Sequence, residues 1–184
     1  MPKTSGYQIP AISTVIIAII SAILLLIFGS IGAKTGYDFS TYETDKFLVT
    51  SVTDGDTVVI KYNDNTESIR LIGINAPETN SDDDYTACVA QAAKNRLQDL
   101  ISQQYIVLMD DTTQTNRDRY QRLLRYIVGN QAIDVGKTLL LEGLAEEYTY
   151  QTDYTKKAEY VAAVETARST QAGMWGSELC ATYK

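Results

Sequence analysis

The sequence of 184 residues contains no histidine. This absence excludes hydrolases with a Ser-His-Asp or Cys-His arrangement, histidine general bases and histidine-ligated zinc. Two cysteines without histidine are also too few for an ordinary structural zinc site. A catalytic metal in this protein would therefore have oxygen ligands, which indicates calcium or magnesium.

Charge is absent from residues 9–33, which are mostly Ile, Leu, Ala and Val. A helix of about 25 residues can cross a hydrocarbon core of roughly 30 Å, and buried core helices are rarely apolar on every face. We predict a transmembrane anchor in residues 1–34, with the rest of the chain outside the cytoplasm at the cell membrane. Lys3 and Lys34 flank the two ends, so charge does not determine the orientation. The alternative is secretion after signal cleavage, although the apolar run exceeds the usual ~7–15 residues.

Basic charge is scarce in the remainder of the chain. Residues 35–184 hold 14 of the 16 Lys and Arg residues and all 23 Asp and Glu residues, a net charge of −9. Because nucleic-acid-binding domains are usually basic, such a function here would depend on a local cluster. Four of the seven arginines lie within residues 117–125. They either supply such a cluster or are ordinary surface charges on an exposed strand.

The hydrophobic pattern predicts a polar linker over residues 35–45 and one domain over residues 46–180. Short β-branched or apolar runs between turn residues predict strands over 47–53, 57–62, 68–74, 105–109 and 120–128. Apolar residues at helical spacing predict helices over 86–102, 133–145 and 155–172. Five strands with a helix between the third and fourth is the order of an OB-type barrel. We therefore predict an α+β protein, a five-stranded OB-type β-barrel with three α-helices, preceded by one transmembrane helix.

Arg70 lies in an apolar stretch, Ile-Arg-Leu-Ile, and must either pair with a carboxylate or face an open site. The segment Asp-Gly-Asp-Thr at residues 54–57 forms a predicted turn, and Asn-Ala-Pro-Glu-Thr follows the third strand at residues 75–79. Phosphodiester hydrolysis builds charge on phosphate oxygens, which arginines and a divalent ion can stabilise. A glutamate can position or deprotonate the attacking water. Such a site needs no histidine.

Three blocks resemble the signature blocks of the thermonuclease (staphylococcal nuclease) family. They are residues 54–57, residues 69–79 and the segment Asp-Arg-Tyr-Gln-Arg-Leu-Leu at residues 118–124. Glu-Gly-Leu-Ala at 142–145 and Gly-Met-Trp at 173–175 are similar too, and the resemblance covers roughly residues 46–180. It implies an OB barrel that cuts DNA or RNA, single-stranded or frayed, with Ca²⁺.

The resemblance also implies catalytic roles. Arg70 and Arg122 would clamp the scissile phosphate, and Glu78 would position or deprotonate the attacking water. Arg119 and Tyr120 would bind the other phosphate of the nucleotide.

For the metal, the resemblance implies that Asp56, Asn75 and the backbone carbonyl of Ala76 are Ca²⁺ ligands, supported through water by Asp54. The family typically has a second calcium-binding aspartate where this chain has Asn75, which keeps an oxygen donor but loses a negative charge. Residues 82–84, Asp-Asp-Asp, replace a segment that can contain lysine and would repel nucleic acid unless they capture a cation.

Tyrosines near the family's substrate-stacking positions follow Ala145, but the register among Tyr148, Tyr150 and Tyr154 is ambiguous, so none of them is assigned. The loss of charge at Asn75 keeps a second interpretation open, a non-catalytic OB-fold module that binds nucleic acid through a weakened metal site. A third is a surface domain that merely binds calcium.

The two cysteines, Cys88 and Cys180, are predicted to form a disulfide, because an exported domain meets an oxidising environment. Two unrelated thiols are the alternative. We expect the protein to be a monomer.

Overall fold

The computed structural model describes residues 46–62, 64–101 and 105–183, which belong to one compact unit. The predicted anchor and the linker lie outside the described residues, so both stay predictions. Among the described helices, none combines the length and the apolar character that crossing a membrane requires.

Five strands close into a barrel in the order β1-β2-β3-β6-β5. Their bounds are Lys46–Val52 for β1, Thr57–Tyr62 for β2, Asn65–Leu71 for β3, Tyr105–Met109 for β5 and Leu123–Val128 for β6. All neighbours are antiparallel except β3 and β6, which run parallel. A bulge between Val49 and Ser51 shifts the register of β1 against β2, as is common where a sheet bends. The predicted five-stranded barrel is confirmed.

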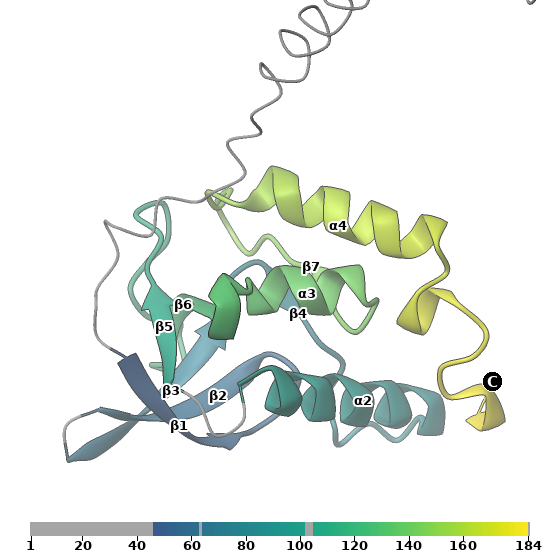
Figure 1. Cartoon of the computed structure of the whole chain (residues 1–184), viewed down its shortest axis with the longest axis horizontal. Coiled ribbons are helices and arrows are strands. Elements are labelled where there is room, and N and C mark those ends of the chain that lie inside the picture. Colours follow the sequence, from purple (N-terminus) through teal and green to yellow (C-terminus); the bar gives the residue numbers. More distant parts are fainter. Residues whose placement is uncertain (1–45, 63, 102–104, 184) are drawn as a thin grey trace, which may run out of the picture. The chain divides into compact units, whose positions relative to one another are not determined.

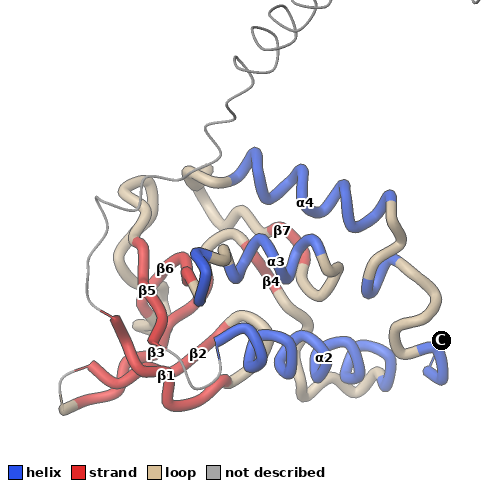
Figure 2. Tube along the Cα trace, in the orientation of Figure 1, coloured by secondary structure: helices blue, strands red, loops and turns tan. Residues whose placement is uncertain are grey.

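Three helices gather on one side of the barrel, with α3 between α2 and α4 (Figures 1 and 2). They are α2 (Asp84–Ile101), α3 (Val135–Leu141) and α4 (Lys157–Ser169), accompanied by short 3-10 helices η2 (Asn130–Ala132), η3 (Gly173–Trp175) and η4 (Ala181–Tyr183). Apolar side chains of the barrel interior and of the inner helix faces form one core. Its fully buried members include Val58, Ile60, Ile69, Leu97, Ile101, Ile106, Ile127, Leu139 and Leu140.

The predicted third strand, residues 68–74, is broken in the structure. β3 ends at Leu71, and Gly73 has a φ of +79°, a conformation that favours glycine. A Cβ atom at Gly73 would also lie 2.5 Å from the Tyr154 ring. The chain then forms β4 (Ile74–Asn75), which leaves the barrel and pairs with β7 (Glu146–Glu147). Periodicity cannot detect this break because both parts of the segment remain apolar.

The loop after β5 is tied to the start of α4 by Asp111. Its carboxylate accepts hydrogen bonds from Tyr126 Oη, from the backbone N–H of Thr113 at 2.9 Å and from that of Thr155 at 2.7 Å. Burial opposes ionisation, but these hydrogen bonds outweigh it and lower the pKa of Asp111 to about 2.

A disulfide joins Cys88 in α2 to Cys180, across a sequence separation of 92 residues and a Cα–Cα distance of 6.0 Å. The Tyr85 hydroxyl, one turn earlier in α2, donates to the backbone carbonyl of Met174 at 3.1 Å. These two links hold the C-terminal segment against the first turns of α2.

Candidate active site

Arg70 occupies the barrel strand β3 between two fully buried residues, and its own side chain is 11% exposed. Its Nη2 pairs with Asp56 Oδ2 at 3.0 Å, while Nη1 donates to the backbone carbonyls of Leu71 at 2.7 Å and Ile74 at 2.8 Å. Burial lowers the pKa of Arg70, and Asp56 opposes that shift. Of the two expectations for an arginine in this strand, the structure provides the carboxylate partner.

The turn that carries Asp56 is positioned by Gly55. A Cβ atom there would lie 2.6 Å from Ala76 Cβ and 2.7 Å from Ala93 Cβ, so only glycine allows the turn to pack this closely against α2 and the segment after β4. This close packing lets the Ala76 N–H donate to Asp56 Oδ2 at 2.9 Å. Asp56, predicted as a metal ligand, and Ala76 are therefore neighbours.

The Asp56 carboxylate is buried and engaged on both oxygens. Thr57 Oγ1 donates to its Oδ1 at 3.0 Å, and Asp54 accepts a hydrogen bond from the Asp56 N–H at 3.0 Å. Burial raises the pKa of Asp56; Arg70 opposes this and the nearby charge of Asp54 adds to it. Because burial disfavours the ionised form of Asp56, a nearby positive charge stabilises that form.

Arg122 lies just before β6, and the parallel pairing of β3 with β6 brings it beside Arg70. Asp118 Oδ1 accepts hydrogen bonds from the backbone N–H of Tyr120 at 2.9 Å and of Arg122 at 3.0 Å, while its Oδ2 accepts from Arg122 Nε at 2.7 Å. Partial burial opposes ionisation, yet these bonds lower the pKa of Asp118. Asp118 thus holds residues 118–122 in a turn, which is why the predicted strand over 120–128 begins only at Leu123.

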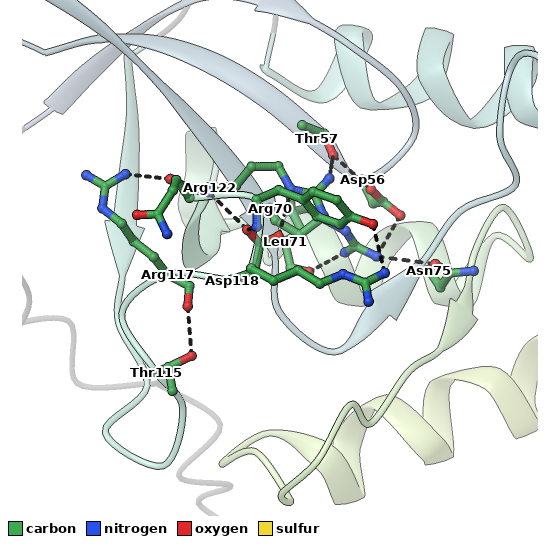
Figure 3. Close-up of polar contacts among 12 residues, drawn as sticks. Asp56, Thr57, Arg70, Leu71, Asn75, Thr115, Arg117, Asp118 and Arg122 are labelled. Carbon is green, nitrogen blue, oxygen red and sulfur yellow. Dashed lines mark hydrogen bonds and ion pairs between the residues drawn. The ribbon is translucent and has the colours of Figure 1, made fainter.

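A chain of polar contacts connects the two arginines (Figure 3). Arg122 Nη1 donates to Thr57 Oγ1 at 3.2 Å, and Thr57 in turn donates to Asp56, the ion-pair partner of Arg70. Among the described residues, Arg122 Nη2 has no hydrogen-bond partner. Thr57 and Asp118 were not assigned roles from the sequence, although both stand inside the signature blocks that could have drawn attention to them.

Tyr120 and Arg119 form an exposed edge next to the arginine pair. Tyr120 is 64% exposed, and Arg119 Nη2 donates to its hydroxyl at 2.7 Å. The guanidinium carbons of Arg119 and Arg122 lie 4.7 Å and 5.3 Å from the centre of the Tyr120 ring. The edge thus combines positive charge with an aromatic face, the two features that bind single-stranded nucleic acid.

The structure separates the three tyrosines that the sequence left unassigned. Tyr154 is buried and hydrogen-bonds to Glu147 at 3.0 Å, so it belongs to the core. Tyr148 and Tyr150 are exposed, with ring centroids 6.3 Å apart. The pKa of Arg119 is raised by its hydrogen bond to Tyr120 and, to a smaller extent, by Tyr150 and Tyr148, which therefore lie within electrostatic reach of it.

Glu78 is exposed in the loop between β4 and α2. Within the described ranges, its carboxylate forms no hydrogen bond or ion pair, so the structure does not bring it into contact with Arg70 or Arg122. Asn75 is also exposed, and its Oδ1 accepts a hydrogen bond from Arg70 Nη2 at 3.3 Å.

The acidic residues 82–84 have a local role. Asp83 Oδ2 accepts a hydrogen bond from the Thr86 N–H at 2.7 Å, and Asp84 opens α2. Hydrogen bonds from Thr86 lower the pKa of Asp83. Carboxylates at a helix start satisfy free N–H groups and complement the helix dipole, which gives Asp83 and Asp84 a structural role.

The residues predicted as metal ligands carry oxygen donors of the type that a hard cation binds. Asp56 and Asp54 supply carboxylates, Asn75 an amide oxygen and Ala76 a backbone carbonyl, and such oxygen donors suit Ca²⁺. Over residues 46–62, 64–101 and 105–183, no cluster of three or more His, Cys, Asp or Glu side chains could hold a metal. The donor set is therefore low in charge and relies on neutral oxygens.

The chain is similar to known proteins over most of its length. The sequence profile named SNase, described as staphylococcal nuclease homologue, matches residues 68–177, more than half of the chain. Similar proteins include a thermonuclease of Staphylococcus intermedius, 29% identical over 167 residues that cover 89% of this chain and 97% of that protein. A thermonuclease of Staphylococcus hyicus is 24% identical over 170 residues, covering 90% and 98%.

The SPbeta prophage-derived endonuclease YokF of Bacillus subtilis (strain 168) is 30% identical over 123 residues. These residues make up 66% of this chain but only 41% of YokF, so the similarity concerns less than half of that protein.

Proposed function

Since the chain belongs to the staphylococcal nuclease family, we propose that it is a calcium-dependent nuclease that hydrolyses phosphodiester bonds of DNA or RNA outside the cytoplasm. The observation that carries this proposal is the linked pair Arg70 and Arg122. Two guanidinium groups, joined through Asp56 and Thr57, stand beside an exposed aromatic and basic edge. The names of relatives that are thermonucleases and endonucleases agree with this chemistry.

The arginines would act on the phosphate. Planar guanidinium groups bind phosphate oxygens bidentately, and groups fixed in advance stabilise developing charge without reorganisation. Arg122 is held by Asp118, and its Nη2 remains available. Arg70 is held by two backbone carbonyls, Asp56 and Asn75, and a phosphate would displace its 3.3 Å contact with Asn75. Both therefore keep their orientation before substrate arrives.

Glu78 would position or deprotonate the attacking water, because its exposed carboxylate has no competing partner in the described part of the chain. Asp56, Asn75 and Ala76 would hold Ca²⁺, with Asp54 supporting it through water. When bound, the ion supplies Lewis-acid stabilisation of phosphate charge. Arg119 and Tyr120 would bind a neighbouring phosphate, and Tyr148 and Tyr150 would stack on bases.

We further propose that the domain works as a monomer held at the membrane by residues 9–33, or secreted if that segment is cleaved. The disulfide between Cys88 and Cys180 supports a location outside the cytoplasm, because reducing compartments rarely keep such bonds.

A nuclease assay on the chain without residues 1–34 tests the proposal against its competitors. Labelled single-stranded DNA and RNA are incubated with calcium, or with a calcium-selective chelator and magnesium. We expect cutting only with calcium. Retention without cutting would favour the nucleic-acid-binding module, and neither retention nor cutting would favour a structural calcium-binding domain. Undiminished cutting in magnesium with the chelator would refute calcium dependence.

Arg117 provides a control for the arginine pair. It lies in the same arginine cluster, but it pairs with Glu67 at 2.9 Å and takes no part in the Asp56–Thr57 chain. Arg122→Ala should reduce turnover about 10²–10³-fold, the scale for losing one fixed charge stabiliser. Arg117→Ala should have a much smaller effect. Equal losses would mean that general positive charge, and not the arginine pair, drives activity.

A further inference from the structure

A cavity of about 290 Å³ is lined in part by Asn75, whose side chain accepts a hydrogen bond from Arg70. Its apolar walls come from Pro77, Tyr85, Val89 and Met174. This volume lies near the lower end of the ~300–1,000 Å³ typical of small-molecule pockets, a size suited to a single flat ring system. Of the residues that line the cavity, only Asn75 has a role in the site proposed above, as a ligand of Ca²⁺.

The polar edge of the cavity is formed by Asn75 and Glu146. These residues stand directly opposite each other in the antiparallel β4–β7 pair, which puts their side chains on the same face. Asn75 Oδ1 already accepts from Arg70, so the amide presents its Nδ2 as a free donor. The exposed Glu146 carboxylate has no hydrogen bond or ion pair to other described residues and presents two acceptors.

The walls are fixed in advance. Tyr85 is bonded to the Met174 carbonyl at 3.1 Å, and Val89 is 1% exposed. The disulfide at Cys88 holds the C-terminal segment against the same helix. A ligand would therefore meet a formed pocket and would order few groups on binding.

The cavity and the proposed phosphate site share Asn75, which lines the cavity and accepts a hydrogen bond from Arg70. The hydrogen bond between Asn75 and Arg70 joins the polar edge of the cavity to the guanidinium that would hold the phosphate.

We propose that this cavity binds the base of the nucleotide next to the scissile phosphate and selects guanine, an inference that rests on the proposed nuclease function. The Watson–Crick edge of guanine presents two adjacent donors, N1–H and the 2-amino group, beside the O6 acceptor. Glu146 accepts from both donors, and Asn75 Nδ2 donates to O6. Adenine, cytosine and thymine each place a mismatched group against the carboxylate or the amide.

The test uses single-stranded oligothymidylates that carry one guanine, adenine, cytosine or hypoxanthine at a fixed position. Cutting at the phosphate beside the unique base should be about 10-fold faster for guanine than for adenine, the effect of one bidentate contact. Hypoxanthine, which lacks the 2-amino group, should fall between them. Glu146→Gln should bring the guanine-to-adenine ratio close to one, because an amide cannot accept from both donors.

Glu165→Gln, an exposed residue of α4, is the matched control and should keep the guanine preference of the unsubstituted chain. Equal cutting beside all four bases, or an unchanged preference in Glu146→Gln, would overturn the proposal. A change that is the same for all four substrates and shifts the calcium midpoint would mean that Glu146 acts through the metal, which overturns it too.

Binding of nucleoside monophosphates separates failure of this inference from failure of the proposed function. Guanosine and adenosine 5′-monophosphates contain no diester to cut, so calorimetric titration measures the cavity even if no substrate is cleaved. Guanosine monophosphate should bind about 10-fold more tightly, and Glu146→Gln should remove the difference. Equal affinities would refute the base site whatever the chain cuts.

Discussion

Removing Arg70 and removing Arg122 should have different consequences, although both are proposed to bind the same phosphate. The Arg70 and Asp56 side chains are 11% and 8% exposed, whereas Arg122 and Asp118 are 27% and 17% exposed. Breaking a buried ion pair leaves an uncompensated buried charge and typically costs about 3–5 kcal/mol. The more exposed pair should be worth much less because solvent screens it.

We therefore expect Arg70→Ala to lower the free energy of unfolding by about 3 kcal/mol, in addition to abolishing most activity. For a domain of this size, that loss corresponds to a melting temperature lower by roughly 10 °C. Arg122→Ala should lose a similar share of activity while its melting temperature falls only slightly. Melting is followed by circular dichroism in a calcium chelator, so that metal binding does not contribute.

A second substitution tests the physical reason. Asp56→Asn in the Arg70→Ala background removes the unpaired carboxylate, so it should restore most of the lost stability without restoring activity. Arg96→Ala is the control, because Arg96 pairs with Glu142 at 2.7 Å on the surface and should cost about 1 kcal/mol or less. If Arg70→Ala melts like the unsubstituted chain, or the double variant is no more stable than the single one, the buried pair does not stabilise the domain as argued.

Four further predictions follow from the same contacts. Asn75→Asp adds a charged ligand and should lower the calcium concentration for half-maximal cutting; an unchanged or higher midpoint in a calcium titration would show that Asn75 is not a ligand. Glu78→Gln should slow cutting by about 10²–10⁴-fold at an unchanged melting temperature, and normal turnover would remove Glu78 from the site. Reducing the Cys88–Cys180 bond should cost at most about 4–5 kcal/mol, seen as a lower urea midpoint with reductant, and two free thiols in the unfolded, unreduced domain would exclude the bond. The pKa of Asp111 is lowered to about 2 from an ordinary 3.8, so its ionised form contributes stability that is full above pH 4 and is lost as the pH falls through 2. Asp111→Asn should therefore lower the free energy of unfolding by about 2 kcal/mol at pH 7 and by progressively less below pH 4. A loss of stability that does not change with pH in acid titrations would contradict this origin.

The sequence determined the local structure and the kind of chemistry. Alternating and helical periodicities predicted the five barrel strands and the three α-helices in their observed order, because these patterns depend on neighbours within a few residues. They did not predict the short strands β4 and β7. The absence of histidine limited a catalytic metal to oxygen ligands, and Arg70 in an apolar strand required a partner or an open site. These conclusions need only residue chemistry and spacing along the chain.

Only the tertiary structure decided which distant residues meet. Parallel pairing of β3 with β6 put Arg122 beside Arg70. The close packing of Gly55 against Ala76 and Ala93 placed Asp56 where it pairs with Arg70. The break at Gly73 turned Asn75 out of the barrel and set it opposite Glu146, more than 70 positions along the chain. Such pairings follow from strand register and from the burial of a shared core, which many residues fix together and no local segment encodes alone.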